Sequence, residues 1–186
     1  MTSISIFCGS SPGFDPVYIK QAQELGRALA ERGSRIIFGG GKVGLMGAVA
    51  NAAMEAGGEV IGVIPQFMMP REVAHEGLTE LIVTESMTDR KLKMHDLSDA
   101  VITLAGGFGT MEELFEVLTW DQLKLISKPI GILNTNRYYD PLIEMMDKMV
   151  GIGFLRPDNR NQLCVSEDIN GLLVEMEDWN KANIPS

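Results

Sequence analysis

The chain has 186 residues, 45% of them hydrophobic and 22% charged, a composition typical of one folded domain and not of a disordered, collagen-like or low-complexity protein. Its formal net charge of −9 argues against a basic surface for nucleic acid or for an anionic membrane. With two cysteines, two histidines, no apolar run long enough to cross a bilayer and no signal-peptide pattern, we expect a cytoplasmic protein without a disulfide framework, a catalytic metal or another cofactor.

Short β-branched runs alternate with longer segments of helical periodicity along the whole chain. The predicted strands cover residues 3–8, 35–38, 59–64, 81–84, 100–104, 129–133 and 163–166, and the predicted helices cover residues 15–32, 45–56, 86–97, 111–125, 138–150 and 169–176. This alternation is typical of repeated βαβ units. We therefore predict one α/β domain over residues 1–186, with a Rossmann-like doubly wound, mostly parallel sheet, helices on both faces and a flexible tail after about residue 177.

Two glycine clusters follow predicted strands and precede predicted helices. They are residues 39–44 (Gly-Gly-Gly-Lys-Val-Gly) and residues 106–110 (Gly-Gly-Phe-Gly-Thr), and a third turn-rich loop with Ser10 follows the first strand. Glycine lets the backbone approach a phosphate closely, and a helix N-terminus presents free N–H groups to it. Each cluster alone is equally explained as a tight turn, but two together favour phosphate binding. Neither matches the P-loop or the GxGxxG dinucleotide pattern.

Charged residues stand beside the second cluster and on the preceding helix. Glu112, Glu113 and Glu116 fall in the first turns after residue 110, where a helix dipole alone would explain carboxylates. Arg90 and Lys91 lie near the N-terminal end of the predicted helix 86–97, an unfavourable place for cations unless an anion is near. Pairing with Glu85 or Asp89 on a solvated face is the alternative explanation.

Three runs together resemble the LONELY GUY family of cytokinin-activating phosphoribohydrolases, whose members were long labelled lysine decarboxylases. These runs are residues 38–47 (FGGGKVGLMG), 87–91 (MTDRK) and 106–113 (GGFGTMEE), and the similarity extends from residue 4 to about residue 165. The family's hallmark is Pro-Gly-Gly-x-Gly-Thr-x-x-Glu. This chain has Ala105 in place of the proline, which removes rigidity but no reactive group.

The resemblance implies a catalytic pair, Arg90 and Glu113, and a purine nucleoside 5′-monophosphate as substrate, either AMP or a prenylated adenine nucleotide (a cytokinin riboside monophosphate). It also implies a homodimer with active sites near the subunit boundary. Together with the loops above, it gives as substrate-contact candidates Ser10, Gly40, Glu72, Lys91, Gly106, Gly107, Phe108, Gly109, Thr110, Met111, Glu112 and Thr119.

The resulting hypothesis is hydrolysis of the N-glycosidic bond, releasing free base and ribose 5-phosphate. The loop at residues 106–110 would anchor the phosphate, Glu113 would act on water or on the ribose, and Arg90 would support the departing base or the phosphate. A decarboxylase would need a Schiff-base lysine for pyridoxal phosphate, and nothing in the sequence singles one out. The remaining alternatives are a non-catalytic nucleotide- or molybdenum-cofactor-binding protein and an interaction protein on the same fold.

Overall fold

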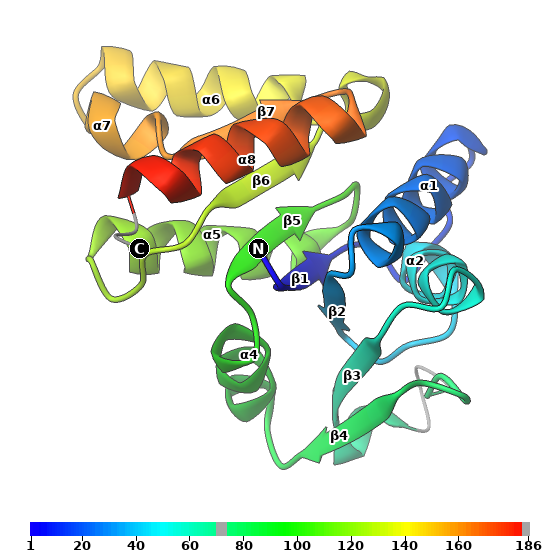
Figure 1. Ribbon diagram of the computed structural model, residues 1–186. Coiled ribbons are helices and arrows are strands. Elements are labelled where there is room, and N and C mark those ends of the chain that lie inside the picture. Colours follow the sequence, from blue (N-terminus) through cyan, green and yellow to red (C-terminus); the bar gives the residue numbers. More distant parts are fainter. Residues whose placement is uncertain (70–73, 184–186) are drawn as a thin grey trace.

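The computed structural model describes residues 1–69 and 74–183, and these form one layered α/β unit around a parallel sheet (Figure 1). The sheet has seven strands in the order β4-β3-β2-β1-β5-β6-β7, and each neighbouring pair is parallel. The strands are β1 (Ser3–Phe7), β2 (Arg35–Phe38), β3 (Val60–Pro65), β4 (Glu80–Thr84), β5 (Ala100–Thr103), β6 (Ile130–Leu133) and β7 (Leu163–Ser166). The predicted doubly wound fold class is confirmed.

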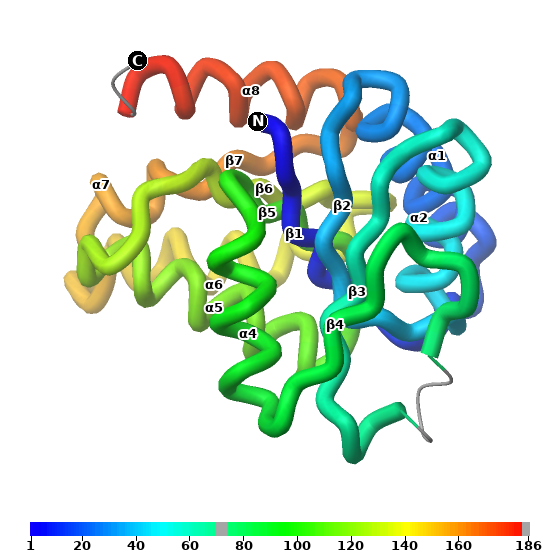
Figure 2. Tube along the Cα trace, turned by 60° about the horizontal axis from the view of Figure 1, so that its bottom comes forward, coloured from blue at the N-terminus to red at the C-terminus, as the bar shows by residue number. Residues whose placement is uncertain are grey.

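The helices cover both faces of the sheet, as a doubly wound fold requires. They are α1 (Val17–Glu31), α2 (Gly44–Glu55), α4 (Met87–Asp96), α5 (Phe108–Gln122), α6 (Asp140–Gly151), α7 (Pro157–Arg160) and α8 (Ile169–Asn183). Two short 3-10 helices also occur, η1 (Gln66–Met68) and η2 (Thr135–Arg137). One apolar core joins the sheet to α1, α2 and α8, and the other joins it to α4, α5 and α6. In Figure 2, α8 runs above the strands, and α4 lies to the left of β3 and β4.

Most side chains of the inner strands are apolar toward both faces, so the sheet carries a core on each side. In β2, Ile36 and Phe38 enter the core under α1 and α2, while Ile37 enters the opposite core. Strand β1 is also buried throughout, and its polar Ser5 satisfies its hydroxyl by donating to Met94 O at 3.1 Å. Central strands of a parallel sheet are buried on both faces, so they read as continuous apolar runs without alternation.

Several element ends differ from the sequence prediction. Helix α5 begins at Phe108, not at Met111, because Gly107 is the extended N-cap residue and the residues after it are already helical. Helix α8 continues to Asn183, beyond the predicted end at Met176, so residues 177–183 extend the helix where the sequence indicated a tail. Within this extension, Trp179 Nε1 donates a hydrogen bond of 2.6 Å to Gln162 Oε1.

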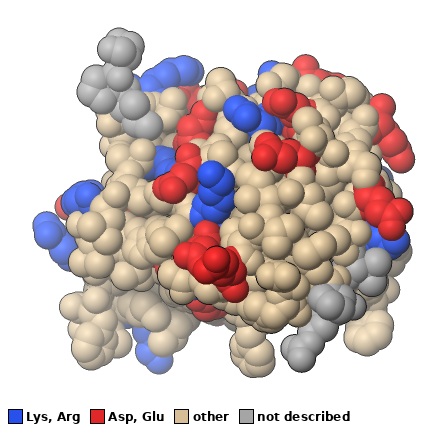
Figure 3. Space-filling view, turned by 90° about the horizontal axis from the view of Figure 1, so that it is seen from below, with Lys and Arg blue, Asp and Glu red and all other residues tan. Residues whose placement is uncertain are grey.

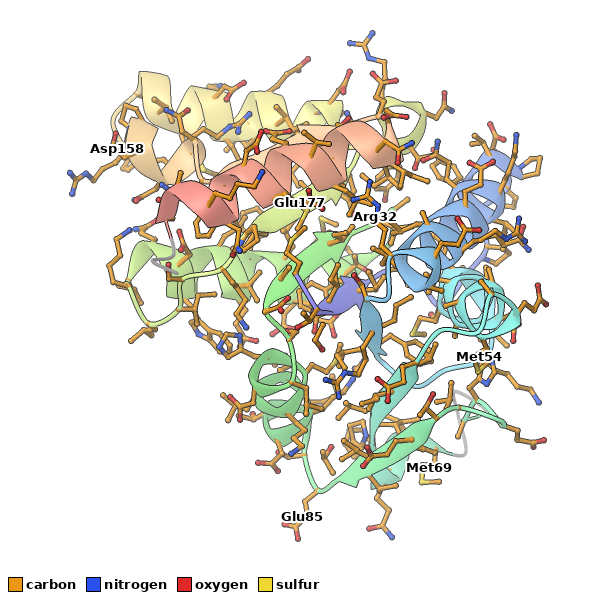
Figure 4. The ribbon with its side chains drawn as sticks, viewed as in Figure 1. Arg32, Met54, Met69, Glu85, Asp158 and Glu177 are labelled. Atoms are coloured by element: carbon orange, nitrogen blue, oxygen red, sulfur yellow. The ribbon has the colours of Figure 1, made fainter. Side chains whose placement is uncertain are left out.

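The sequence alone did not predict how distant segments are tied together. Arg32 at the end of α1 and Glu177 of α8 lie together where the two helices approach, with 3.0 Å between Arg32 Nη1 and Glu177 Oε1 (Figure 4).

On the face in Figure 3, acidic and basic groups adjoin one another among uncharged residues and form no basic stripe. Among the described residues, no helix is long and apolar enough to cross a membrane.

The order of the strands fixes where a ligand can bind. Strands β1 and β5 are neighbours at the centre of the sheet, and the loops that follow them lead to helices on opposite faces, α1 and α5. Ligands of open parallel sheets bind in the crevice at such a switch point, outside the carboxyl ends of the strands. The loop after β5 contains the second glycine cluster, and the loop after β1 contains Ser10, both of which the sequence indicated as substrate-binding candidates.

Candidate active site

The loop after β5 leads into the N-terminus of α5, where backbone amide groups are free. Gly107 is the N-cap of α5, and among the described residues no side chain caps this end of the helix. The N–H groups of the first helical turn therefore have no intrahelical partners and can bind an anion. Gly106 is required by packing, because a Cβ at this position would collide with Thr110 Oγ1.

Arg90 of α4 and Glu113 of α5 form a buried ion pair next to this helix end. Arg90 Nη2 lies 3.5 Å from Glu113 Oε1, and the two residues are only 7% and 9% exposed. Arg90 Nη1 also donates to Met87 Sδ at 3.8 Å, while Arg90 Nε is buried without a hydrogen-bond partner among the described residues. A paired buried carboxylate and guanidinium hold their charges in a low-dielectric site, where they act strongly on a bound ligand.

Gly39, at the end of β2, makes room for the arginine. A Cβ on Gly39 would collide with Arg90 Nη2 and would also contact Met46 Sδ at 3.1 Å. The first glycine cluster thus serves the site by leaving space for the Arg90 side chain. The sequence pattern indicated the cluster, but it did not distinguish this role from a phosphate contact.

A cavity of about 300 Å³ opens between the helix N-terminus and the ion pair. Of the predicted site residues it is lined by Ser10, Arg90, Gly107, Phe108, Gly109, Thr110, Glu112 and Glu113. Sequence reasoning missed five of its lining residues, Cys8, Gly9, Met46, Met68 and Met87. The three methionines come from α2, η1 and α4, so no local spacing could have grouped them. They give the cavity an adaptable apolar wall.

Cys8 is part of the same wall and is not a nucleophile there. Burial, followed by the nearby Glu113 carboxylate, raises the pKa of its thiol above the ordinary value. The thiolate is the reactive form of cysteine, so Cys8 remains an inert thiol at neutral pH.

Lys91 does not line this cavity and instead links α4 to α5. Its Nζ donates to Glu116 Oε1 at 2.9 Å and also to Glu112 Oε1. Burial disfavours the ammonium form, but the hydrogen bonds to the two glutamates outweigh it and raise the pKa of Lys91. This link lies one residue from the Arg90–Glu113 pair on both helices, so it helps to fix the spacing of α4 and α5.

The other predicted site residues lie elsewhere. Gly106 lines a neighbouring cavity of about 350 Å³, Gly40 turns away with φ +78° and accepts a hydrogen bond from His75 N, and Met111 packs against the core under α5. Thr119 lines a third cavity, of about 270 Å³, between α5, α6 and α7. Glu72 lies outside the described residues. Among residues 1–69 and 74–183, no group of three or more histidine, cysteine, aspartate or glutamate side chains is arranged to hold a metal ion.

Comparison with known proteins identifies the family. Residues 46–176 match the family model described as "Possible lysine decarboxylase". The cytokinin riboside 5′-monophosphate phosphoribohydrolase of Rhodococcoides fascians is 47% identical over 92% of this chain and 87% of its own length. The cytokinin riboside 5′-monophosphate phosphoribohydrolase LOG7 of Arabidopsis thaliana is 43% identical over 95% of this chain and 81% of its own length.

A solved structure supports the fold alone. The molybdenum cofactor binding protein of Rippkaea orientalis superposes with a TM-score of 0.71 at 22% identity, over 95% of this chain and 96% of that one. The two phosphoribohydrolases share about twice this sequence identity with the chain and cover nearly the same part of it. The chain therefore belongs to the LONELY GUY family, whose curated members carry the name cytokinin riboside 5′-monophosphate phosphoribohydrolase.

Proposed function

We propose that this chain hydrolyses the N-glycosidic bond of a purine nucleoside 5′-monophosphate, with adenine or an N6-prenylated adenine as the base. The products are the free base and ribose 5-phosphate. The observation that carries the proposal is the buried Arg90–Glu113 pair, 3.5 Å apart, beside a cavity that begins at the uncapped N-terminus of α5. The names of its relatives in Rhodococcoides fascians and Arabidopsis thaliana support the same reaction.

The helix end would hold the 5′-phosphate. The amides of Gly107, Phe108 and Gly109 stand at the positive end of the α5 dipole and line the cavity. Ser10, from the loop after β1, brings a hydroxyl to the same cavity. Because the protein carries a net charge of −9, this local geometry and not a general positive field must attract the anion.

Glu113 would act on the ribose, one turn into the helix from the phosphate. Breaking the bond between C1′ and the base nitrogen leaves positive charge on the ribose, which a carboxylate stabilises. The oxygen of a water then bonds to C1′, and a proton from that water ends on the released base. Arg90 holds the Glu113 carboxylate and supports either the phosphate or the departing base.

The methionines suit a purine more than a small polar ligand. Met46, Met68 and Met87 line one wall of the cavity and can adapt to a planar base with or without a prenyl chain. A non-catalytic binder of nucleotide or molybdenum cofactor would have no need of a buried ion pair beside the cavity, because burying two charges is costly. We therefore favour hydrolysis over binding alone.

A homodimer belongs to the proposal. Thr119 lines the cavity between α5, α6 and α7, separate from the one that holds Glu113, so a substrate contact by Thr119 requires a second subunit. The same face exposes Phe154 by 85% and Phe115 by 37%, which a partner would cover. Light scattering should give the mass of a dimer, and the substitution Phe154→Asp should shift it toward a monomer. A monomeric mass for the unmodified chain would refute this arrangement.

The cytoplasm remains the proposed compartment. Cys8 and Cys164 are both buried and unpaired, as expected of a protein kept in a reducing environment. Cell fractionation tests this directly.

A panel of nucleotides tests the reaction. AMP, its N6-isopentenyl derivative, GMP and CMP are each incubated with the protein, and free base and ribose 5-phosphate are quantified by chromatography. Adenosine, which lacks the phosphate, is the control and should react poorly because the helix end has nothing to bind. Turnover of adenosine at the rate of AMP, or release of no base from any nucleotide, would overturn the proposal.

A further inference from the structure

Two tyrosines before α6 hold the backbone that leads into the phosphate loop. Tyr139 Oη donates to Leu104 O at 2.7 Å, and Tyr138 Oη donates to Gly106 O at 2.7 Å. Tyr139 is fully buried and belongs to the core, whereas Tyr138 is 44% exposed. The second hydrogen bond is therefore not needed to form the core.

The contact to Gly106 fixes the direction of the next amide. A trans peptide is planar, so its C=O and N–H groups point in opposite directions. The described residues contain no cis peptide bond, so the Gly107 N–H points away from the Tyr138 hydroxyl. Gly106, Gly107 and Tyr138 all line the cavity of about 350 Å³, and of these three residues Gly107 also lines the cavity that holds Glu113. Because the Gly107 N–H points away from the Tyr138 hydroxyl, it faces the Glu113 side of the loop.

This peptide is flanked by two glycines and can rotate easily. A rotation by half a turn changes ψ of Gly106 and φ of Gly107, which is −95° in the structure, and takes the latter into the positive region that glycine tolerates. The rotated peptide would direct the Gly106 carbonyl oxygen, in place of the N–H, toward a bound phosphate. The partial negative charge of the Gly106 carbonyl oxygen would then face the negative charge of the phosphate.

We propose that Tyr138 is a positioning residue for the phosphate, because its hydroxyl holds the Gly106–Gly107 peptide with the N–H toward the Glu113 cavity. This inference rests on the proposed function, which places the phosphate at that loop. Tyr138 is itself oriented by edge-on contacts with Tyr18, at 6.0 Å between ring centroids, and with Tyr139, at 4.9 Å. The ring is therefore held in place when only its hydroxyl is removed.

The substitution Tyr138→Phe tests the hydrogen bond. One such bond is worth about a fivefold change in an equilibrium constant. We expect KM for AMP and the inhibition constant of inorganic phosphate each to rise about fivefold, with kcat unchanged and the melting temperature lowered by no more than about 4 °C. Tyr18→Phe, which removes the hydroxyl of the adjacent ring, is the control and should change neither constant. Unchanged constants in Tyr138→Phe, or a fall in kcat without weaker phosphate inhibition, would overturn the inference.

A second substitution tests the rotation of the peptide. Gly107→Ala places a Cβ where no atom lies within 4 Å, and it disfavours the rotated form because alanine avoids positive φ. In the Gly107→Ala background, adding Tyr138→Phe should therefore leave the phosphate inhibition constant nearly unchanged. A fivefold rise there as well would refute the rotation. If the unmodified protein releases no base from any nucleotide, the proposed function fails. If the unmodified protein turns over AMP but Tyr138→Phe has unchanged constants, only the role of Tyr138 fails.

Discussion

Replacing Glu113 by glutamine should remove most of the activity while keeping the fold. Glutamine has the shape of glutamate but no charge, so it cannot stabilise a positive ribose. At an effective dielectric constant of about 20 and the 3.5 Å seen between Glu113 and Arg90, two unit charges attract each other by about 5 kcal/mol. The charge on the ribose is partial, so we expect a loss of about 3–5 kcal/mol in the transition state, which corresponds to a fall in kcat of two to four orders of magnitude.

The same change affects stability less than activity. Glutamine leaves Arg90 without its ionic partner but retains an oxygen that can accept a hydrogen bond, so the free energy of unfolding should fall by about 1–3 kcal/mol. Glu177→Gln is the matched control, because it also removes an ion-paired carboxylate from a helix, far from the cavity. Base release is followed by chromatography at saturating AMP, and unfolding is followed by circular dichroism in urea. If Glu113→Gln retains more than about a tenth of the wild-type kcat, the role of Glu113 is wrong.

Three further predictions follow from particular contacts. Gly39→Ala should lower kcat by at least about a hundredfold, because its Cβ would displace the Arg90 guanidinium. Gly151→Ala is the control and should leave kcat unchanged, because no atom lies within 4 Å of an added Cβ there. Measuring kcat of both variants at equal folded fraction tests this. Burial lowers the pKa of Lys128 from 10.5 to about 8, and its Nζ donates to Ser98 O at 2.6 Å. Between these two pKa values the folded state therefore binds fewer protons than the unfolded state. The free energy of unfolding of the wild type, relative to that of Lys128→Met, should rise between pH 8 and pH 10.5 by up to about 1.4 kcal/mol per pH unit in urea titrations. A difference that stays flat or falls with pH would contradict the buried charge. Finally, protein purified with pyridoxal phosphate should be colourless and release no carbon dioxide from lysine, despite the description of its family model, and a coloured active preparation would show that the decarboxylase label is right.

The sequence predicted the architecture well because the relevant signals are local. Short apolar runs such as residues 36–38 favour strands buried on both faces, and Ser86 caps α4 with its hydroxyl accepting from Asp89 N, as expected. The start of α5 was predicted too late because Gly107 and Gly109 look like loop residues, although free N–H groups at a helix start tolerate them. The short helices η1, η2 and α7 were missed because they carry no periodic apolar pattern.

The candidate site was predicted in part. The motif residues Arg90, Thr110 and Glu113 do meet at one cavity, and Phe108 and Gly109 line it as well. Lys91 instead pairs with two glutamates on α5, and Gly40 faces away from the cavity toward β3 and β4. Adjacent residues on a helix point in different directions, so a motif cannot show which of its members reach the ligand.

The sequence by itself determined the succession of strands and helices along the chain, the two glycine-rich strand ends and the family. Each of these depends on residues close together in the chain or on similarity to other chains. Only the tertiary structure decided that Arg90 and Glu113 are buried as a pair, that Gly39 makes room for the arginine, and that Tyr138 holds the peptide before Gly107. Those contacts join segments from different strands and helices, and their distances come from the packing of helices against the sheet, which no local pattern encodes.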